Sequence, residues 1–145
     1  MESQPTLSTN HSMPTSVVIP ELAYPDVRQA VDWLCHTFGF VERLRIGNHR
    51  AQLTLGTGAI IVTQSAESSD SRRLPNPHAI MVRVAHVDKH YENAKQHGAP
   101  IVSPPTDYPY GERQYTADDL GGHRWTFSQT IADVHPADWG GLLLE

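Results

Sequence analysis

Few residues of this sequence combine a reactive side chain with a spacing that indicates chemistry. The single cysteine, Cys35, falls in an apolar helical pattern without a predictable activating neighbour, so a core residue is favoured over a nucleophile. The histidines form neither an H-E-x-x-H motif nor a Ser-His-Asp pattern. Gly56-Thr57-Gly58 joins two predicted strands and opens no helix, which is not how a phosphate loop is built. Any chemistry must therefore come from side chains that the fold brings together.

Composition limits what this chain can be. Its 145 residues suit one domain, and a hydrophobic content of 39% can bury a core. A formal net charge of -5 argues against a nucleic-acid partner, which needs a clustered basic face. One cysteine allows no internal disulfide and fits a reducing, cytoplasmic setting. No stretch is apolar and long enough to cross a membrane.

The first half of the chain predicts one strand, one helix and three further strands. The helix begins after Asp26, a plausible N-cap, and ends at Gly39, with apolar residues at three- and four-residue steps between them. Pro20 favours an edge position for the first strand. The predicted strands are 17–23, 40–46, 51–55 and 59–64.

The second half repeats this order. A strand over 78–84 precedes a helix over 87–97 that Gly98 ends, and the later strands cover 101–103, 112–118 and 123–129. Such a repeat predicts an α+β fold of two βαβββ units that form a cupped mixed sheet, as half-barrels, with the helices on the outer face.

The remaining segments are expected to connect or extend these units. Residues 1–16 lack apolar runs and predict a flexible N-terminal tail. The domain itself spans 17–130, with a first unit at 17–64, a polar linker at 65–77, a second unit at 78–130, and a C-terminal extension at 131–145.

Several short motifs, in order, resemble one superfamily. Tyr24-Pro25-Asp26-Val27 followed by Phe38-Gly39-Phe40 is similar to the opening of a vicinal-oxygen-chelate domain, the fold of glyoxalases, bleomycin-resistance proteins and dioxygenases. Tyr110-Gly111-Glu112-Arg113, the turn from Asp118 to His123 and Trp125-Thr126-Phe127-Ser128-Gln129 resemble its closing strands. The similarity covers 17–129 and is greatest to single-domain bleomycin-resistance-like and glyoxalase-like proteins. It implies a homodimer and a small-molecule ligand in the cup.

The resemblance also implies four metal-ligand positions, on the first, fourth, fifth and eighth strands of the enzymes. The first of them falls on Ile19 and the last on Thr126, and neither side chain is a good ligand for a divalent metal. The other two fall on Val62 and Ala79, or on Gln64 and His78 if each strand slips. A metal-free cup is therefore expected. If a metal were present, the ligands implied by the resemblance would be Glu21, Gln64 and His78.

Alternation of side chains along the strands gives an expected cup lining of apolar, hydroxyl and charged groups. It comprises Glu21, Ile60, Met81, Arg83, Arg113, Tyr115, Thr126 and Ser128. The loop 104–111, which carries Tyr108 and Tyr110, is expected either to close over the ligand as a lid or to form a rigid connection; Tyr110 is counted with the ligand-binding residues.

We expect the protein to bind or sequester a small molecule. Its expected partners are that ligand and a second copy of the chain. The alternatives are a metal-dependent lyase, isomerase or ring-cleaving dioxygenase, and a metal-free enzyme in which Glu21 is the general base beside Arg83 or Arg113. An accessory domain without a ligand is a further alternative.

These ligand positions predict how the protein responds to metals. Addition of Zn, Ni, Mn or Fe should raise the melting temperature little, and His78→Ala should leave that small response unchanged, because two of four ligands are missing. Thermal unfolding with and without each metal measures this. One metal per chain that survives dialysis in the wild type and is lost from His78→Ala would favour the metal-dependent enzyme.

Overall fold

The computed structural model describes residues 7–65 and 78–144, so all of the predicted linker 65–77 except Ser65 lies outside the described residues. The first unit has the predicted order of one strand, one helix and three strands. Its elements are β1 (Glu21–Tyr24), α1 (Val27–Phe38), β2 (Val41–Ile46), β3 (Arg50–Leu55) and β4 (Gly58–Gln64).

The second unit repeats that order and adds a short 3₁₀ helix after its last strand. Its elements are β5 (Ala79–Arg83), α2 (Val87–Gln96), β6 (Ile101–Tyr108), β7 (Glu112–Asp118), β8 (Arg124–Thr130) and η1 (Pro136–Trp139). Neither helix in the described part of the chain has the length and apolar character that a membrane span requires.

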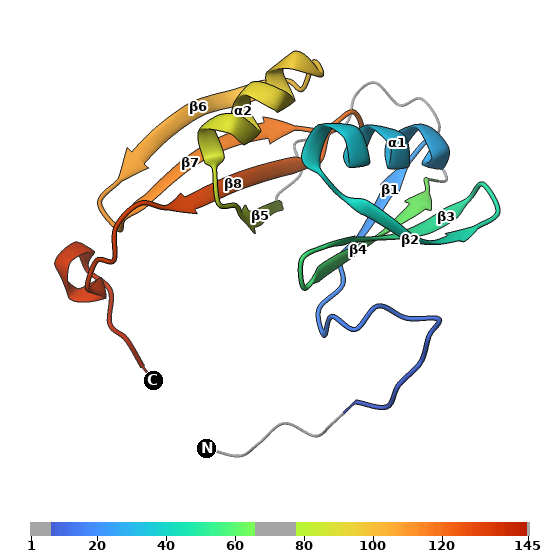
Figure 1. The fold of residues 1–145 in the computed structure, drawn as a ribbon, viewed down its shortest axis with the longest axis horizontal. Coiled ribbons are helices and arrows are strands. Elements are labelled where there is room, and N and C mark those ends of the chain that lie inside the picture. The colour runs from blue at the N-terminus through green and yellow to red at the C-terminus, as the bar shows by residue number, and fades with distance from the viewer. Residues whose placement is uncertain (1–6, 66–77, 145) are drawn as a thin grey trace.

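Each unit folds its strands into a four-stranded mixed sheet, as the repeat predicted. The first sheet has the order β1-β4-β3-β2 and the second has the order β5-β8-β7-β6. In each sheet the first and last strands of the unit pair in parallel, and the other neighbours pair antiparallel. One helix packs on one face of each sheet (Figure 1). We call the opposite face of each sheet its cup face.

The helix α1 begins and ends where the sequence predicted. The Asp26 carboxylate accepts a hydrogen bond from the Gln29 backbone N–H at 3.1 Å, which satisfies one of the free N–H groups of the first turn. Gly39 ends the helix with φ of 88°, a left-handed conformation that favours glycine. The buried residues between these caps recur at helical spacing and cover the first sheet.

The helix-covered faces of the two sheets share one hydrophobic core. Phe38, at the end of α1, lies 4.8 Å from Phe127 and 5.5 Å from Trp125 between ring centroids, and both of these residues belong to β8. His90 of α2 lies 4.1 Å from the Phe127 ring. Buried side chains from both units form one continuous cluster. The two units are therefore packed against each other and not merely joined by the linker.

Two strands differ from the sequence-based prediction because of proline. The first strand begins at Glu21 and not at residue 17; Pro20 accepts a hydrogen bond from Ile61 N at 2.9 Å but has no N–H with which to continue the ladder. Residues 104–108, predicted as part of a loop, continue β6 instead. This strand is at the sheet edge, and its register shifts around Pro104 and Pro105, so the missing donors are tolerated.

A buried carboxylate fastens β1 to the turn between β7 and β8. Asp119 is 3% exposed and accepts hydrogen bonds from the Tyr24 hydroxyl at 2.6 Å and from Trp125 Nε1 at 3.0 Å. Its other oxygen accepts from the backbone N–H groups of Gly121 and His123, each at 2.9 Å. Burial, together with the nearby Asp119 charge, raises the pKa of Tyr24 well above its usual range, so the phenol stays a donor.

The turn itself fits closely around Tyr24. A Cβ at Gly121 would lie 2.6 Å from a ring carbon of Tyr24, so a larger residue would push the two units apart. The ring of His123 lies edge-on to Tyr24, and its Nε2 is 2.9 Å from the Ala23 carbonyl, to which it donates. His123 is a structural residue in this turn.

We predict that Asp119→Asn destabilises the protein by about 2–4 kcal/mol, because an amide cannot accept all four hydrogen bonds and leaves buried donors unsatisfied. Urea unfolding followed by circular dichroism measures this. The matched control is Asp118→Asn, which removes a surface ion pair with Arg124 and should cost less than about 1 kcal/mol. Equal effects of the two variants would contradict the role of Asp119.

We also predict that His90 makes stability fall on mild acidification. Burial lowers the pKa of His90, although the Phe38 carbonyl opposes this shift. The unfolded chain therefore takes up a proton first, and stability present above about pH 6.5 is lost as the pH falls toward the folded-state pKa. His90→Gln should remove this part of the pH dependence in urea unfolding between pH 7.5 and 5. His86 is exposed, so the His86→Gln variant should retain this pH dependence of stability. If the stability of His90→Gln depends on pH as that of the wild type does, His90 is not the source of the dependence.

Candidate functional site

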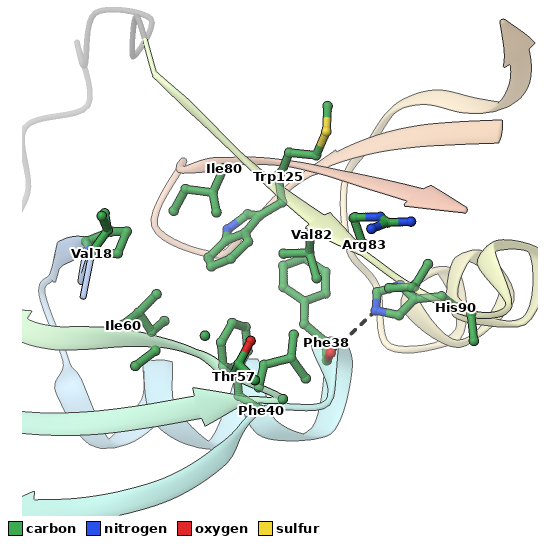
Figure 2. Close-up of a pocket in the computed structure, with 18 residues that line it drawn as sticks. Val18, Phe38, Phe40, Thr57, Ile60, Ile80, Val82, Arg83, His90 and Trp125 are labelled. Atoms are coloured by element: carbon green, nitrogen blue, oxygen red, sulfur yellow. Dashed lines mark hydrogen bonds between the residues drawn. The ribbon is translucent and has the colours of Figure 1, made fainter. Parts of the chain in front are cut away.

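A cleft with a volume of about 700 Å³ lies between the two units. One wall is the turn between β3 and β4 with the start of β4, and the other wall is β5 with the residues that follow it. Figure 2 shows Ile60, Ile80, Val82 and Trp125 directed toward the space between these walls. The cleft is thus a gap at the edge of the shared core.

Most of the lining is apolar. Trp125 packs against Phe38 and Phe40 with ring centroids 5.5 Å and 5.6 Å away, so these three rings form a rigid aromatic wall. Aliphatic side chains from the segment before β1, from β4 and from β5 supply the rest, among them Val18, Leu55, Ile60, Ile80, Val82 and Val84. A ligand here would bury apolar surface at about 25 cal/mol per Å².

Two ionisable side chains border the cleft. His90 Nε2 donates toward the Phe38 carbonyl at 3.4 Å (Figure 2). Its Nδ1 accepts from the Tyr115 hydroxyl, and the two contacts together are the arrangement of a neutral imidazole. Arg83 contributes its stem, while its guanidinium donates to the Thr130 hydroxyl at 3.0 Å and points away from the aromatic wall (Figure 2). The cleft therefore offers few polar contacts.

The cup face of the second sheet carries a connected row of polar side chains. Glu112 accepts from the hydroxyls of Ser128 at 2.5 Å and Thr130 at 2.6 Å, and Gln114 donates to Ser128 at 3.1 Å. Burial acts to raise the pKa of Glu112, but these hydrogen bonds and the charge of Arg83 outweigh it and lower the pKa. Glu112 is thus held as an ionised carboxylate, which acts as an acceptor.

Aromatic side chains from the β6–β7 turn and the C-terminal extension meet beside this polar row. Tyr108 and Tyr110 stack with ring centroids 5.4 Å apart, and Trp139 of η1 lies 5.4 Å from Tyr110. The Tyr110 hydroxyl is 3.5 Å from Gln114 Oε1. A Cβ on Gly111 would lie 2.3 Å from the Ala132 carbonyl oxygen, so this contact between turn and extension requires glycine.

Strand pairing places part of the predicted lining on the cup faces. Glu21 lies on the cup face of the first sheet. Met81 and Arg83 pair with Thr126 and Ser128, and these four lie on the cup face of the second sheet.

Three predicted lining residues, Ile60, Tyr115 and Arg113, lie on the helix-covered face and not on the cup face, but Ile60 still lines the cleft. Ile60 and Tyr115 are buried in the shared core, and Tyr115 pairs with Phe127 under α2. Arg113 reaches α2, where it pairs with Asp88 at 3.1 Å, and it also pairs with Asp107. A shift of one residue exchanges the faces of a strand, which is why Gln114 and Glu112 take the places expected for Tyr115 and Arg113.

Sequence reasoning missed most of the cleft. Phe38, Phe40 and Trp125 belong to the buried core, and only the assembled fold places them behind the cleft. Trp139 follows the last strand in a segment without regular hydrophobic periodicity, so no sequence signal connected it with Tyr110.

The residues implied as metal ligands are not brought together. Glu21 lies on the cup face of the first sheet and is 3.6 Å from Arg50, whereas Gln64 pairs with Tyr24 on the other face and donates to the Pro25 carbonyl. His78 is exposed and precedes β5. Among the residues that the structure describes, no three His, Cys, Asp or Glu side chains form a group that could hold a metal.

The side chains expected for the metal-free enzyme, a Glu21 general base beside Arg83 or Arg113, are likewise not brought together. The ion-pair partner of Glu21 is Arg50, while Arg83 and Arg113 contact other residues in the second unit. Glu21 is more than half exposed, and its side chain lies on a different sheet from both arginines.

Solved structures with the same architecture include close and distant relatives. TioX from Micromonospora sp. ML1 is 38% identical, with a TM-score of 0.67 over 80% of this chain and 99% of that one. A glyoxalase/bleomycin resistance protein/dioxygenase from Nocardioides is 17% identical, with a TM-score of 0.66 over 99% and 92% of the two chains. Lactoylglutathione lyase from Agrobacterium tumefaciens is 13% identical, with a TM-score of 0.61 over 80% and 94%. No curated protein matches this chain.

A family profile agrees with these structural neighbours. It is the profile of the Glyoxalase/Bleomycin resistance protein/Dioxygenase superfamily, and it matches residues 13–127, from before β1 into β8. The chain therefore belongs to the glyoxalase/bleomycin resistance protein/dioxygenase superfamily.

Proposed function

We propose that this protein binds a small molecule in the cleft between its two units and does so without a metal. The observation that carries the proposal is the cleft itself, whose volume of about 700 Å³ lies within the range of roughly 300–1,000 Å³ usual for ligand sites. Its mostly apolar lining favours a ligand with an apolar frame, held mainly by burial of apolar surface.

The chemistry of the cleft favours binding over turnover. Its imidazole, His90, is already hydrogen-bonded on both ring nitrogens, and its neutral form is favoured by burial. The guanidinium of Arg83 is directed to Thr130. A rigid wall with few free polar groups suits sequestration of an apolar compound, and the cytoplasm is the compartment we propose for it. The metal-dependent enzyme expected as an alternative is distinguished by the metal response of wild type and His78→Ala.

The ligand prediction is tested by matched tryptophan variants. Val18 lines the mouth of the cleft and Val41 is exposed on β2, outside it. A thermal-shift screen of antibiotics and apolar metabolites should yield compounds that stabilise the wild type, and Val18→Trp should weaken their binding at least about tenfold by filling the mouth. Val41→Trp should bind them as the wild type does. Compounds that bind Val18→Trp undiminished would place the site elsewhere, and a screen without any binder would refute the proposal.

We also propose that the protein is a C2 homodimer. The strands β1 and β5 are edge strands of their sheets, and exposed apolar side chains lie close to both, with Val17 81% and Met81 59% exposed. A second copy would cover this apolar surface and the open edges. Light scattering at micromolar concentration should give twice the chain mass of 16.1 kDa, and a monomer throughout that range would contradict the dimer.

A further inference from the structure

The cup face of the first sheet is covered by the chain's own N-terminal segment. Gln52, Ile61 and Ala59 share this face, and they are only 3%, 5% and 6% exposed. In the described part of the chain the helix α1 lies on the opposite face, and Figure 1 shows the N-terminal segment on the side away from α1. On the second sheet, the equivalent face leaves Met81 59% exposed. The burial on the first sheet therefore comes from this segment.

Residues 10–16, which we call the strap, are held through two backbone carbonyls and one side-chain hydroxyl. Gln52 Nε2 donates to the Ser12 carbonyl at 2.8 Å, and Arg43 Nη2 donates to the neighbouring His11 carbonyl at 2.8 Å. The Ser16 hydroxyl donates to the Thr57 carbonyl at 2.5 Å. Arg43 also donates to Gln52 Oε1, which fixes the Gln52 amide with its N–H groups toward the strap. The flexible tail predicted for 1–16 includes residues 1–6, which lie outside the described residues, and its flexibility stays a prediction.

The side chains of the strap contribute little to its attachment. Met13 is 43% exposed and His11, Ser12 and Thr15 are exposed as well, whereas Pro14 is buried. Two carbonyls, the Ser16 hydroxyl and one proline ring thus attach the strap, and the two carbonyls are groups that any peptide backbone carries. A segment with so little apolar burial is weakly held and can be displaced.

The geometry points to a second binding site: we propose that Arg43 and Gln52 form a receptor for two adjacent amide carbonyls of a peptide backbone. The strap occupies this receptor in the resting chain, and it must leave before an external peptide-like ligand can bind there. Because the strap is tethered, its effective concentration at the site is high, and an external ligand competes at a disadvantage. The strap borders the ligand cleft through Thr57, but Arg43 and Gln52 do not line that cleft, so variants at Arg43 test this proposal without altering the cleft lining.

The experiment weakens the strap within the full-length protein. Pro14→Glu places a charge where the strap is buried, and Thr15→Glu places the same charge at an exposed neighbour as the control. The probe is a fluorescein-labelled peptide of residues 7–18 with the natural sequence, and fluorescence anisotropy measures its binding. The Pro14→Glu protein should bind the peptide at least about tenfold more tightly than wild type or Thr15→Glu, because its own strap no longer competes.

A second pair of variants tests the carbonyl receptor directly. In the Pro14→Glu protein, Arg43→Ala should reduce peptide binding at least about tenfold, since one carbonyl loses its charged donor. Arg45→Ala is the matched control, because Arg45 is exposed on the same strand and pairs with Glu42 instead. Circular dichroism and melting temperature verify that each variant is folded. The proposal is overturned if no variant binds the peptide, or if wild type and Pro14→Glu bind it equally. It is also overturned if Arg43→Ala leaves peptide binding unchanged.

Discussion

The buried Asp119 carboxylate is the interaction on which the arrangement of the two units depends. It collects hydrogen bonds from the phenol of Tyr24 in the first unit and from the indole of Trp125 in the second. A carboxylate that is almost free of solvent is costly to bury unless its oxygens are satisfied, and here four donors meet it. The requirement fixes β1 relative to the β7–β8 turn, and Gly121 allows the close approach.

This junction also shapes the ligand cleft. Trp125 donates to Asp119 from one end of its ring system, while its ring forms the wall of the cleft with Phe38 and Phe40. The indole is therefore oriented by a hydrogen bond as well as by packing, and it holds the buried aromatic cluster behind the cleft in place. His90 lies at the border of the cleft beside Phe38 and Phe127, and its burial there favours the neutral imidazole. Fold stability and the candidate site thus rest on shared residues.

The two cup faces show how a repeated architecture acquires different surfaces. On the second sheet, paired polar residues bond to one another in a row from Gln114 through Ser128 and Glu112 to Thr130. On the first sheet, the corresponding face includes the apolar Ile61 and Ala59, and the strap covers it. The polar face needs no cover because its groups tolerate water, whereas the apolar face gains from burial. Both faces follow from the alternation of side chains along strands that pair in the same order.

The sequence alone determined the local elements and their repetition. Asp26 and Gly39 set the ends of α1 through backbone hydrogen bonds and a left-handed residue, and both effects act over a few neighbouring positions. Hydrophobic periodicity likewise predicted two βαβββ units and a cup, as the structure confirms. Prolines at an edge strand were less informative, because their cost depends on which strand lies beside them.

Tertiary structure alone decided which faces and distant residues meet. Tyr115 and Arg113 lie on the helix side because β7 pairs with β8 in one particular register, and a one-residue change would reverse them. Tyr24 and Asp119 are 95 residues apart, and Tyr110 meets a tryptophan from the C-terminal extension. The cleft, the strap and the Asp119 junction all depend on such long-range contacts. Local propensity carries no information about them, since the free energy that selects them comes from burial and hydrogen bonding in the assembled fold.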